Sequence, residues 1–328
     1  MILITGGAGF IGSNLVAALE EEGARDLVVC DRLGAGDKWR NLGKRELAAL
    51  ITPEALPGFL EIQGKNVEIV FHLGASSSTT ETDADLVIAT NFTLSRLLWD
   101  WCAATGKRFI YASSAATYGD GKAGFDDDAA PAALARLKPL NAYGWSKHLF
   151  DRRVARLVER AGPLPSQWVG LKFFNVYGPN EYHKGAQQSV VAQIYPRAAQ
   201  NAPCTLFRSH RAGIPDGGQK RDFVYVKDCV DLMLWLYREP KVCGLFNAGS
   251  GIARSFADLA AAVYRALGKE PMIDYVDTPV EIRDKYQYFT EARMMRIRDA
   301  GYAPPGTPLE EGVRDYVQRY LAAEDPYL

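Results

Sequence analysis

Tyr143 and Lys147 have the residue types and the spacing for acid/base chemistry, and both lie in the segment Asn141–Lys147, which reads NAYGWSK. Four residues apart on a helix, a phenol and an ammonium occupy the same face. A free tyrosine has a pKa of about 10, and a fixed cation nearby favours the phenolate and lowers that pKa. The pair therefore predicts a tyrosine that exchanges a proton near neutral pH. The same pattern also fits an exposed aromatic ring beside a solvated charge, so the rest of the chain has to decide.

A glycine turn near the start of the chain supplies that context. The segment Thr5–Gly12 (TGGAGFIG) follows an apolar run and opens an amphipathic one. Gly6, Gly9 and Gly12 allow the backbone to approach a pyrophosphate closely, and a helix N-terminus favours its negative charge. Asp31 ends the next apolar run, about 20 residues further on, where a carboxylate can accept hydrogen bonds from an adenosine ribose. This order of features predicts a dinucleotide-binding site.

The charges around Asp31 are compatible with two nicotinamide cofactors. Asp31 by itself is typical of proteins that bind NAD. Arg32 follows directly and Lys38 lies just beyond, and cations at these places suit the ribose 2′-phosphate of NADP. NADP is therefore favoured over NAD, unless Arg32 and Lys38 are ordinary surface charges.

A second polar segment follows a later apolar run. It spans Tyr111–Gly119 and reads YASSAATYG. The hydroxyl of Ser114 is placed to hydrogen bond to a substrate oxygen beside Tyr143. Alone, these residues would fit a serine-rich turn. Together with Tyr143, Lys147 and the glycine turn, Ser114 indicates a site where a tyrosine and a serine act on one oxygen atom.

Short apolar runs alternate with helix-period segments through the first half of the chain. Strands that alternate with helices are joined by right-handed crossovers into a parallel sheet covered on both faces. The expected fold is therefore α/β, a Rossmann-type doubly wound parallel sheet. The expected strands are Met1–Ile4, Leu27–Cys30, Ile69–Leu73, Phe109–Ala112 and Val169–Phe174, and the expected helices are Ile11–Glu22, Thr90–Ala104 and Tyr143–Arg160.

The composition of the sequence changes after about Gly178, where prolines and glycines interrupt the apolar segments. We expect a nucleotide-binding Rossmann domain over residues 1–175 and a smaller, mainly substrate-binding C-terminal lobe over residues 176–328, with helices at Phe256–Leu267 and Glu310–Leu321. Asp222–Val226 has the pattern of a further strand that could return to the main sheet, and the segment near 222–240 is expected to return to the nucleotide-binding domain. Ligands of doubly wound folds bind at the carboxyl ends of the strands, so the second lobe is expected to close over them.

The composition argues against several classes of partner and site. The 328 residues include 38 Lys and Arg and 39 Asp and Glu, a net charge of −1, which does not favour binding to nucleic acid or to an anionic membrane. Five cysteines without a C-x-x-C pair indicate reduced thiols, and four dispersed histidines indicate no metal site. The start of the chain lacks the features of a secretory signal and no apolar stretch reaches the length of a membrane span, so we expect a cytoplasmic protein.

Taken together, these residues resemble the extended short-chain dehydrogenase/reductase family, over essentially the whole chain. In that family the tyrosine is the acid/base, the lysine binds the nicotinamide ribose and lowers the pKa of the tyrosine, and the serine orients the reacting oxygen. The resemblance implies these roles for Tyr143, Lys147 and Ser114. Sugar-nucleotide dehydratases of the family have Thr-Asp-Glu where this chain has Ser114–Ala116, so water elimination is not expected.

Four further segments make the resemblance narrower, to the epimerases of this family that act on an ADP-linked heptose. The discriminating feature is a His-Lys-Gly sequence, because ordinary 4-epimerases of the family are not expected to have a lysine there. The resemblance implies that Lys184 is a second acid/base opposite Tyr143, whereas without it Lys184 would fit a surface lysine after a proline turn. The four segments are Gly74–Glu81, Phe173–Gly185, Lys220–Val226 and Tyr286–Thr290.

At the matching positions, the resemblance also implies two sets of ligand-binding residues. Arg221 can bind a diphosphate through its guanidinium, or it can pair with a nearby acid. One departure is the link Ser209–Gln219, which is longer than is usual in this family. The cofactor set is Gly6, Gly9, Phe10, Ile11, Gly12, Asp31, Arg32, Lys38, Leu73, Gly74, Ala75, Ser76, Ser77, Asn91, Tyr143, Lys147, Val176 and Lys184. The substrate set is Ser114, Asn175, Ala186, Gln193, Phe207, Arg221 and Tyr286.

The reaction that the resemblance implies inverts one carbon without net redox change. Tyr143 or Lys184 takes the hydroxyl proton at the heptose C6, a 6-ketone forms and turns, and the other residue returns a proton. The implied cofactor is NADP, the implied partner is the small-molecule substrate ADP-heptose, a precursor of the lipopolysaccharide core, and the implied assembly is a homo-oligomer, with a pentamer as the expected form. Two alternatives stay open: a 4-epimerase or reductase for another nucleotide sugar, and a catalytically inactive nucleotide-binding scaffold.

Overall fold

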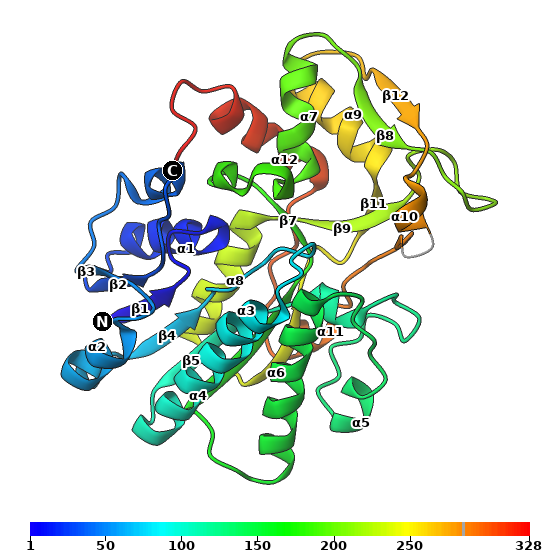
Figure 1. Cartoon of the computed structure of the whole chain (residues 1–328). Coiled ribbons are helices and arrows are strands. Elements are labelled where there is room, and N and C mark those ends of the chain that lie inside the picture. Colours follow the sequence, from blue (N-terminus) through cyan, green and yellow to red (C-terminus); the bar gives the residue numbers. More distant parts are fainter. Residues whose placement is uncertain (284–285) are drawn as a thin grey trace.

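A seven-stranded parallel sheet with helices on both faces forms the larger part of the molecule (Figure 1). It is seen in a computed structural model that describes residues 1–283 and 286–328. The order of the strands across the sheet is β3-β2-β1-β4-β5-β6-β10. From β1 the chain adds strands first on one side, as β2 and β3, and then on the other side, beginning with β4. The predicted Rossmann-type doubly wound fold is confirmed. The strands are β1 (Ile2–Thr5), β2 (Leu27–Cys30), β3 (Ala49–Ile51), β4 (Ile69–His72), β5 (Arg108–Ser114), β6 (Gln167–Phe173) and β10 (Gly244–Ala248).

The central strands are apolar runs because both of their faces are covered. Every residue of β1, β2, β4 and β6 is buried. In a parallel sheet both faces meet helices, so a continuous apolar run, and not an alternating one, is the expected pattern. All five predicted strands are confirmed. The sheet also contains two strands that were not predicted, β3 and β10.

Two layers of helices cover the sheet. Helices α1 (Phe10–Glu21) and α8 (Val226–Arg238) pack side by side, and their apolar residues share one hydrophobic cluster with Ile4, Val29 and Phe71 of the sheet. On the opposite face lie α2 (Leu56–Gln63), α4 (Leu94–Thr105) and α6 (Ala142–Glu159). There Trp99 of α4 is fully buried and meets the ring of Phe109 on β5 edge-on, with 5.9 Å between the ring centroids.

A smaller lobe lies over the carboxyl ends of the strands (Figure 1). Its core is formed by α7 (Val190–Ala199), α9 (Phe256–Ala266) and α12 (Leu309–Tyr316). A three-stranded sheet has the order β11 (Ala253–Ser255), β9 (Lys220–Tyr225) and β7 (Asn175–Tyr177), and a two-stranded sheet pairs β12 (Ile273–Val276) with β8 (Cys204–Phe207). The division of the chain into residues 1–175 and 176–328 stays a prediction.

The prediction that the strand Asp222–Val226 returns to the main sheet is wrong. This segment forms most of β9, which pairs with β7 and β11 in the smaller sheet. The chain returns to the main sheet only after β9, through α8 and then β10, which pairs with β6. An apolar run indicates that a strand is buried, but it does not specify which sheet contains the strand.

Short elements connect these layers. They are η1 (Asp37–Leu42), η2 (Gly64–Asn66), α3 (Ala84–Ile88), the π-helical η3 (Ala89–Thr93), η4 (Ala115–Tyr118), α5 (Pro131–Leu134), η5 (Tyr182–Gln187), α10 (Val280–Arg283), α11 (Met295–Asp299) and the π-helical η6 (Val317–Leu321). Within residues 1–283 and 286–328, no helix combines the length and the apolar character that a membrane crossing requires.

Gly170 is a position where the main sheet leaves no room for a side chain. It lies in β6, and a Cβ atom there would come within 2.5 Å of the Tyr111 ring and 2.7 Å of Leu245. We expect Gly170→Ala to lower the free energy of unfolding by about 1–3 kcal/mol, as overpacking of a core does, and urea unfolding measures this change. Gly58→Ala is the matched control, because Gly58 is exposed in α2 and no atom lies within 4 Å of the new Cβ. An equal loss at Gly58 would contradict the packing argument.

Candidate active site

A cleft of about 630 Å³ opens where β1, β4, β5 and β6 end. Gly6 follows β1, Gly74 follows β4, and Ser114 and Phe173 are the last residues of β5 and β6, and all four line it. Because parallel strands all point the same way, their carboxyl ends bring together residues that are far apart in the sequence. The smaller lobe contributes further lining residues from β7 and η5.

The glycine turn between β1 and α1 has the shape of a phosphate cradle. Gly6 has a φ of +70°, and a Cβ on it would lie 2.5 Å from the backbone nitrogen of Gly74. A Cβ on Gly12 would lie 2.1 Å from the carbonyl oxygen of Gly6. Helix α1 begins after Gly9 without a side-chain cap, so its first N–H groups are available to an anion. These features fit the pyrophosphate of a dinucleotide.

Asp31 and Lys38 form the polar end of the cleft. The Asp31 carboxylate accepts hydrogen bonds from the backbone N–H of Ala8 at 3.0 Å and from the Lys38 ammonium at 2.7 Å. Both residues line the cleft. The predicted cofactor residue Arg32 does not line it, because its guanidinium pairs with Glu54 on the surface. A phosphate at this end of the cleft would therefore meet Lys38.

Asn91 and Ser76 lie behind the cleft and shape its wall. The Asn91 side chain accepts from the Ser76 N–H at 2.8 Å and donates to the Ser76 carbonyl at 2.9 Å and to the Ser146 hydroxyl at 3.0 Å. Ser146 in turn donates to the carbonyl oxygen of Tyr143 at 2.7 Å. Neither Asn91 nor Ser76 lines the cleft itself. Asn91, in the π-helical η3, therefore ties the loop after β4 to the start of α6.

Ser114, Tyr143 and Lys147 all line the cleft, as the sequence predicts. Lys147 is only 4% exposed and donates to the carbonyl oxygen of Ala112 at 2.7 Å. Burial lowers the pKa of Lys147 to about 8, and the negative charge of Asp151 opposes this effect. Burial raises the pKa of Tyr143, and hydrogen bonding with Ser114 opposes that rise. In the chain itself the phenol is thus a weaker acid than a free tyrosine, which differs from the lowered pKa that the Tyr143–Lys147 spacing predicts.

Lys184 lines the same cleft from the smaller lobe. Its ammonium lies 5.2 Å from the centroid of the Phe10 ring, and burial lowers its pKa while Glu181 opposes the change. The buried carboxylate of Glu181 accepts hydrogen bonds from the hydroxyl of Ser189, at 2.6 Å, and from its N–H. These contacts close the loop that contains Lys184 at its two ends.

A second cluster in the smaller lobe brings together three predicted substrate residues. The Arg221 guanidinium lies 5.4 Å from the centroid of the Tyr286 ring, and Tyr286 meets Phe207 edge-on at 6.0 Å. Arg221 is 9% exposed, and among the residues that the structure describes no carboxylate forms an ion pair with it. The neighbouring Gln287 side chain donates to the carbonyl of Gly119, just after η4. The cluster therefore lies beside the segment that begins at Ser114, although none of its three members lines the 630 Å³ cleft.

The remaining predicted residues lie in or near the cleft. Phe10, Ile11, Leu73, Ala75, Ser77, Val176 and Ala186 line it. Gln193 lies behind Ala186 and donates to its carbonyl oxygen at 3.3 Å. Asn175 is exposed on β7 and does not line the cleft.

Several lining residues were not predicted. They are Thr79, Thr80, Ala112, Ser113, Phe173, Phe174, His183 and Gln187. His183 is the one with a recognisable signal, since it directly precedes Lys184 in the His-Lys-Gly sequence. It lies 3.2 Å from the Asn41 amide, and burial lowers its pKa to about 4, so the imidazole is neutral at physiological pH.

Comparison with known proteins gives the family. The model of the NAD dependent epimerase/dehydratase family matches residues 2–249. The ADP-L-glycero-D-manno-heptose-6-epimerase of Nitratidesulfovibrio vulgaris (strain DP4) is 50% identical over 331 residues, covering 100% of both chains. The crystal structure of the Helicobacter pylori ADP-L-glycero-D-manno-heptose-6-epimerase superposes with a TM-score of 0.79 at 29% identity, over 98% of this chain and 96% of that one. The UDP-glucose 4-epimerase of Thermus thermophilus, in complex with NAD, gives 0.75 at 25% identity, over 98% and 99%.

A family model that matches about three quarters of the chain, and a relative that is half identical from end to end, agree with the glycine cradle and with the placement of Ser114, Tyr143 and Lys147 in one cleft. This chain belongs to the NAD dependent epimerase/dehydratase family.

Proposed function

We propose that this protein inverts C6 of the heptose in ADP-D-glycero-D-manno-heptose to give ADP-L-glycero-D-manno-heptose, an isomerase activity that supplies a precursor of the lipopolysaccharide core. The observation that supports it most directly is Lys184 in the same cleft as Tyr143, in a chain that is 50% identical over its full length to an ADP-L-glycero-D-manno-heptose-6-epimerase. The cofactor is a nicotinamide dinucleotide, as the family requires, and the glycine cradle fits it.

The residues of the cleft have different roles in the proposed reaction. When bound, the nicotinamide accepts the hydride from C6 and returns it. Tyr143 or Lys184 takes the C6 hydroxyl proton, Ser114 orients that oxygen, and the second proton carrier serves the ketone after it has turned. Buried Lys147, with its pKa lowered only to about 8, stays largely protonated at neutral pH and supplies a fixed positive charge beside Tyr143. Burial raises the pKa of Tyr143, and the hydrogen bond with Ser114 opposes that rise and so favours proton release.

We propose that the diphosphate of the substrate binds at the cluster of Arg221, Tyr286 and Phe207. A guanidinium without an ionic partner in the described chain binds a diphosphate through paired hydrogen bonds. The aromatic rings beside it hold it in place. In this proposal residues 1–175 form the nucleotide-binding domain, to which α8 and β10 add, and residues 176–328 otherwise form mainly the substrate-binding lobe.

We propose NADP as the preferred cofactor, with Lys38 and not Arg32 as the residue that contacts the 2′-phosphate. Lys38 lines the cleft, whereas Arg32 pairs with Glu54 on the surface. Asp31 keeps a role for the ribose, because its carboxylate is held at the polar end of the cleft by Ala8 and Lys38. NAD remains a weaker ligand in this arrangement.

Replacement of either proton carrier tests the proposed function. We expect Tyr143→Phe and Lys184→Ala each to slow interconversion of the two ADP-heptose epimers by about 10²–10⁴-fold, since each removes a proton carrier. Proton NMR of the epimer mixture measures the rate, with UDP- and GDP-sugars as competing substrates. Lys122→Ala is the control, because the Lys122 side chain is 88% exposed and does not line the cleft. Full activity of Lys184→Ala would refute the two-carrier mechanism, and turnover of UDP-sugars alone would refute the substrate.

Isotope labelling distinguishes hydride return from removal of a C6 proton. We expect epimerisation in D₂O to give product without deuterium at C6, because the hydride that leaves C6 comes back to it. The protons that Tyr143 and Lys184 carry belong to the hydroxyl group and exchange freely. Mass spectrometry of the product measures the incorporation. One deuterium per turnover at C6 would contradict the mechanism.

Lys38 and Arg32 form a matched pair for the choice of cofactor. We expect Lys38→Ala to weaken NADP binding by about 10–100-fold, the value of a charge-assisted hydrogen bond, and to change NAD binding much less. Arg32→Ala is the control, since Arg32 pairs with Glu54 and does not line the cleft. Isothermal titration of each variant with NADP and NAD gives the dissociation constants. A larger effect at Arg32 than at Lys38 would show that the phosphate lies elsewhere.

A further inference from the structure

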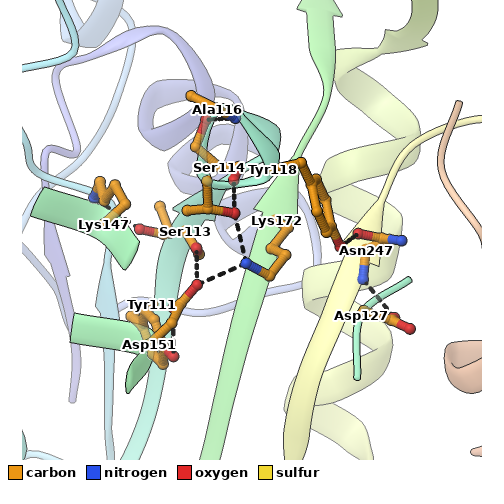
Figure 2. Close-up of polar contacts among 12 residues, drawn as sticks. Tyr111, Ser113, Ser114, Ala116, Tyr118, Asp127, Lys147, Asp151, Lys172 and Asn247 are labelled. Carbon is orange, nitrogen blue, oxygen red and sulfur yellow. Dashed lines mark hydrogen bonds and ion pairs between the residues drawn. The ribbon is translucent and has the colours of Figure 1, made fainter. Parts of the chain in front are cut away.

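A fully buried ion pair lies behind the candidate catalytic residues, and the reaction proposed above does not use it (Figure 2). Lys172 on β6 and Asp151 on α6 are 2.8 Å apart, and neither side chain is exposed. The Asp151 carboxylate also accepts hydrogen bonds from the hydroxyls of Tyr111, at 3.0 Å, and Ser113, at 2.7 Å, both on β5. The pair therefore joins β5, β6 and α6 beneath the cleft.

Stability alone does not account for these two charges. Removal of an ion pair from water costs several kcal/mol per ion, and an apolar pair of similar size is often equally stable or more so. Lys172 lies in β6, whose seven residues are all buried, so an apolar side chain would suit the strand. Each charge is nevertheless satisfied by polar partners, and their contacts lead towards the cleft.

One series of contacts leads from Lys172 to Ser114. The Lys172 ammonium donates to the hydroxyl oxygen of Thr117 at 2.6 Å, and the Thr117 hydroxyl donates to the carbonyl oxygen of Ser114 at 2.8 Å. On the other side of Ser114, the Ser113 hydroxyl donates to Asp151. Figure 2 shows Ser113 and Ser114, at the end of β5, beside Lys172 and Asp151. The pair therefore restrains the backbone on both sides of Ser114.

A second connection leads from Asp151 to Lys147. The two residues are four apart on α6, so they lie on the same face of the helix, one turn apart. Lys147 reaches the carbonyl oxygen of Ala112 on β5, the strand that also presents Ser113 to Asp151. The negative charge of Asp151 raises the pKa of Lys147 against the effect of burial. Asp151 therefore favours the charged form of Lys147, and through Ser113 it fixes the strand whose Ala112 carbonyl binds the ammonium.

We propose that Lys172 and Asp151 are positioning residues of the epimerase site, which fix Ser114 through Thr117 and Ser113 and hold the Lys147 ammonium in its place. This inference rests on the proposed function, because it assumes that Ser114 and Lys147 act on the substrate and the cofactor. Neither Lys172 nor Asp151 lines the cleft, so neither touches a ligand there. Their effect is on geometry and on charge.

The pH dependence of the reaction reports on Asp151 in a way that a purely structural pair would not. On its own helix Lys147 faces Tyr143 and Asp151, on β4 it faces His72, and on β5 it meets the carbonyl of Ala112. Burial lowers the pKa of His72 to about 3, so His72 carries no charge near neutral pH. Lys147 acts as a cation, so activity falls as the pH rises through its pKa. Loss of the Asp151 charge lowers that pKa, and the falling limb moves to lower pH.

Four variants of the full chain test the proposal, each measured for interconversion of ADP-heptose epimers across a range of pH. We expect Lys172→Met to lower kcat by about 100-fold, as a misplacement of the catalytic groups does, with KM much less affected. Thr117→Val, which removes only the bridging hydroxyl, lowers kcat in the same direction, and Lys172→Arg restores most of the activity. Asp151→Asn moves the falling limb of the kcat/KM profile to lower pH.

Lys227→Met is the matched control. Lys227 forms an ion pair with Asp315 at the same distance of 2.8 Å, and its ammonium lies over the rings of Tyr225 and Tyr320, but it is not part of the cleft. We expect its kcat and its pH profile to match those of the wild type. Thermal unfolding of all variants separates a loss of activity from a loss of fold.

Two results would overturn the proposal: a wild-type kcat in folded Thr117→Val and Lys172→Met, or an unchanged falling limb in Asp151→Asn. If Lys172→Met does not fold, Thr117→Val decides the first point. If the wild-type protein turns over a different nucleotide sugar, the proposed function fails, and the same comparison of variants is made with that sugar. The two failures are therefore distinguishable.

Discussion

The hydrogen bond between the Lys147 ammonium and the carbonyl oxygen of Ala112, 2.7 Å long, is the interaction on which the site depends. Lys147 is almost fully buried, so water cannot satisfy its charge and protein groups have to do so. This requirement holds α6 against β5 in one register. Tyr143 lies one turn earlier on α6 and Ser114 lies two residues further along β5, so the same contact brings phenol and hydroxyl together in the cleft.

Lys184, the second proton carrier in the proposed mechanism, lies on a loop of the smaller lobe. The loop that contains Lys184 is closed by Glu181, whose carboxylate accepts two hydrogen bonds from Ser189 at the far end of the loop. Tyr143 reaches the cleft from α6, which packs on the main sheet, and Lys184 reaches it from the loop of the smaller lobe. Each of these two elements is fixed by its own buried polar contacts. The proposed inversion uses this arrangement, because a ketone that turns has to meet a proton carrier in each of its orientations.

The sequence predicts the sheet and most of the cleft for identifiable reasons. The buried strands are continuous apolar runs, and the glycine turn and the Tyr143–Lys147 spacing are local patterns, which do not depend on distant contacts. The destination of β9 and the ion pair of Lys172 with Asp151 are different. Both depend on which elements become neighbours in space, and a lysine within the apolar run of β6 has no local signal of its own. The clustering of Phe207, Arg221 and Tyr286 follows from the family resemblance alone, since they are far apart in the sequence.

The two lysines of the cleft illustrate how one physical effect serves two purposes. Burial lowers the pKa of both, because an ammonium loses its hydration. For Lys147, the opposing charge of Asp151 belongs to a core network with two hydroxyl donors and a second lysine, and the ammonium itself is bound to a backbone carbonyl. That environment keeps a proton in place. For Lys184, the opposing charge is Glu181, whose own pKa burial raises. In the proposed reaction Lys147 keeps its proton and Lys184 exchanges one, and the two lysines differ in the polar groups around them, not in residue type.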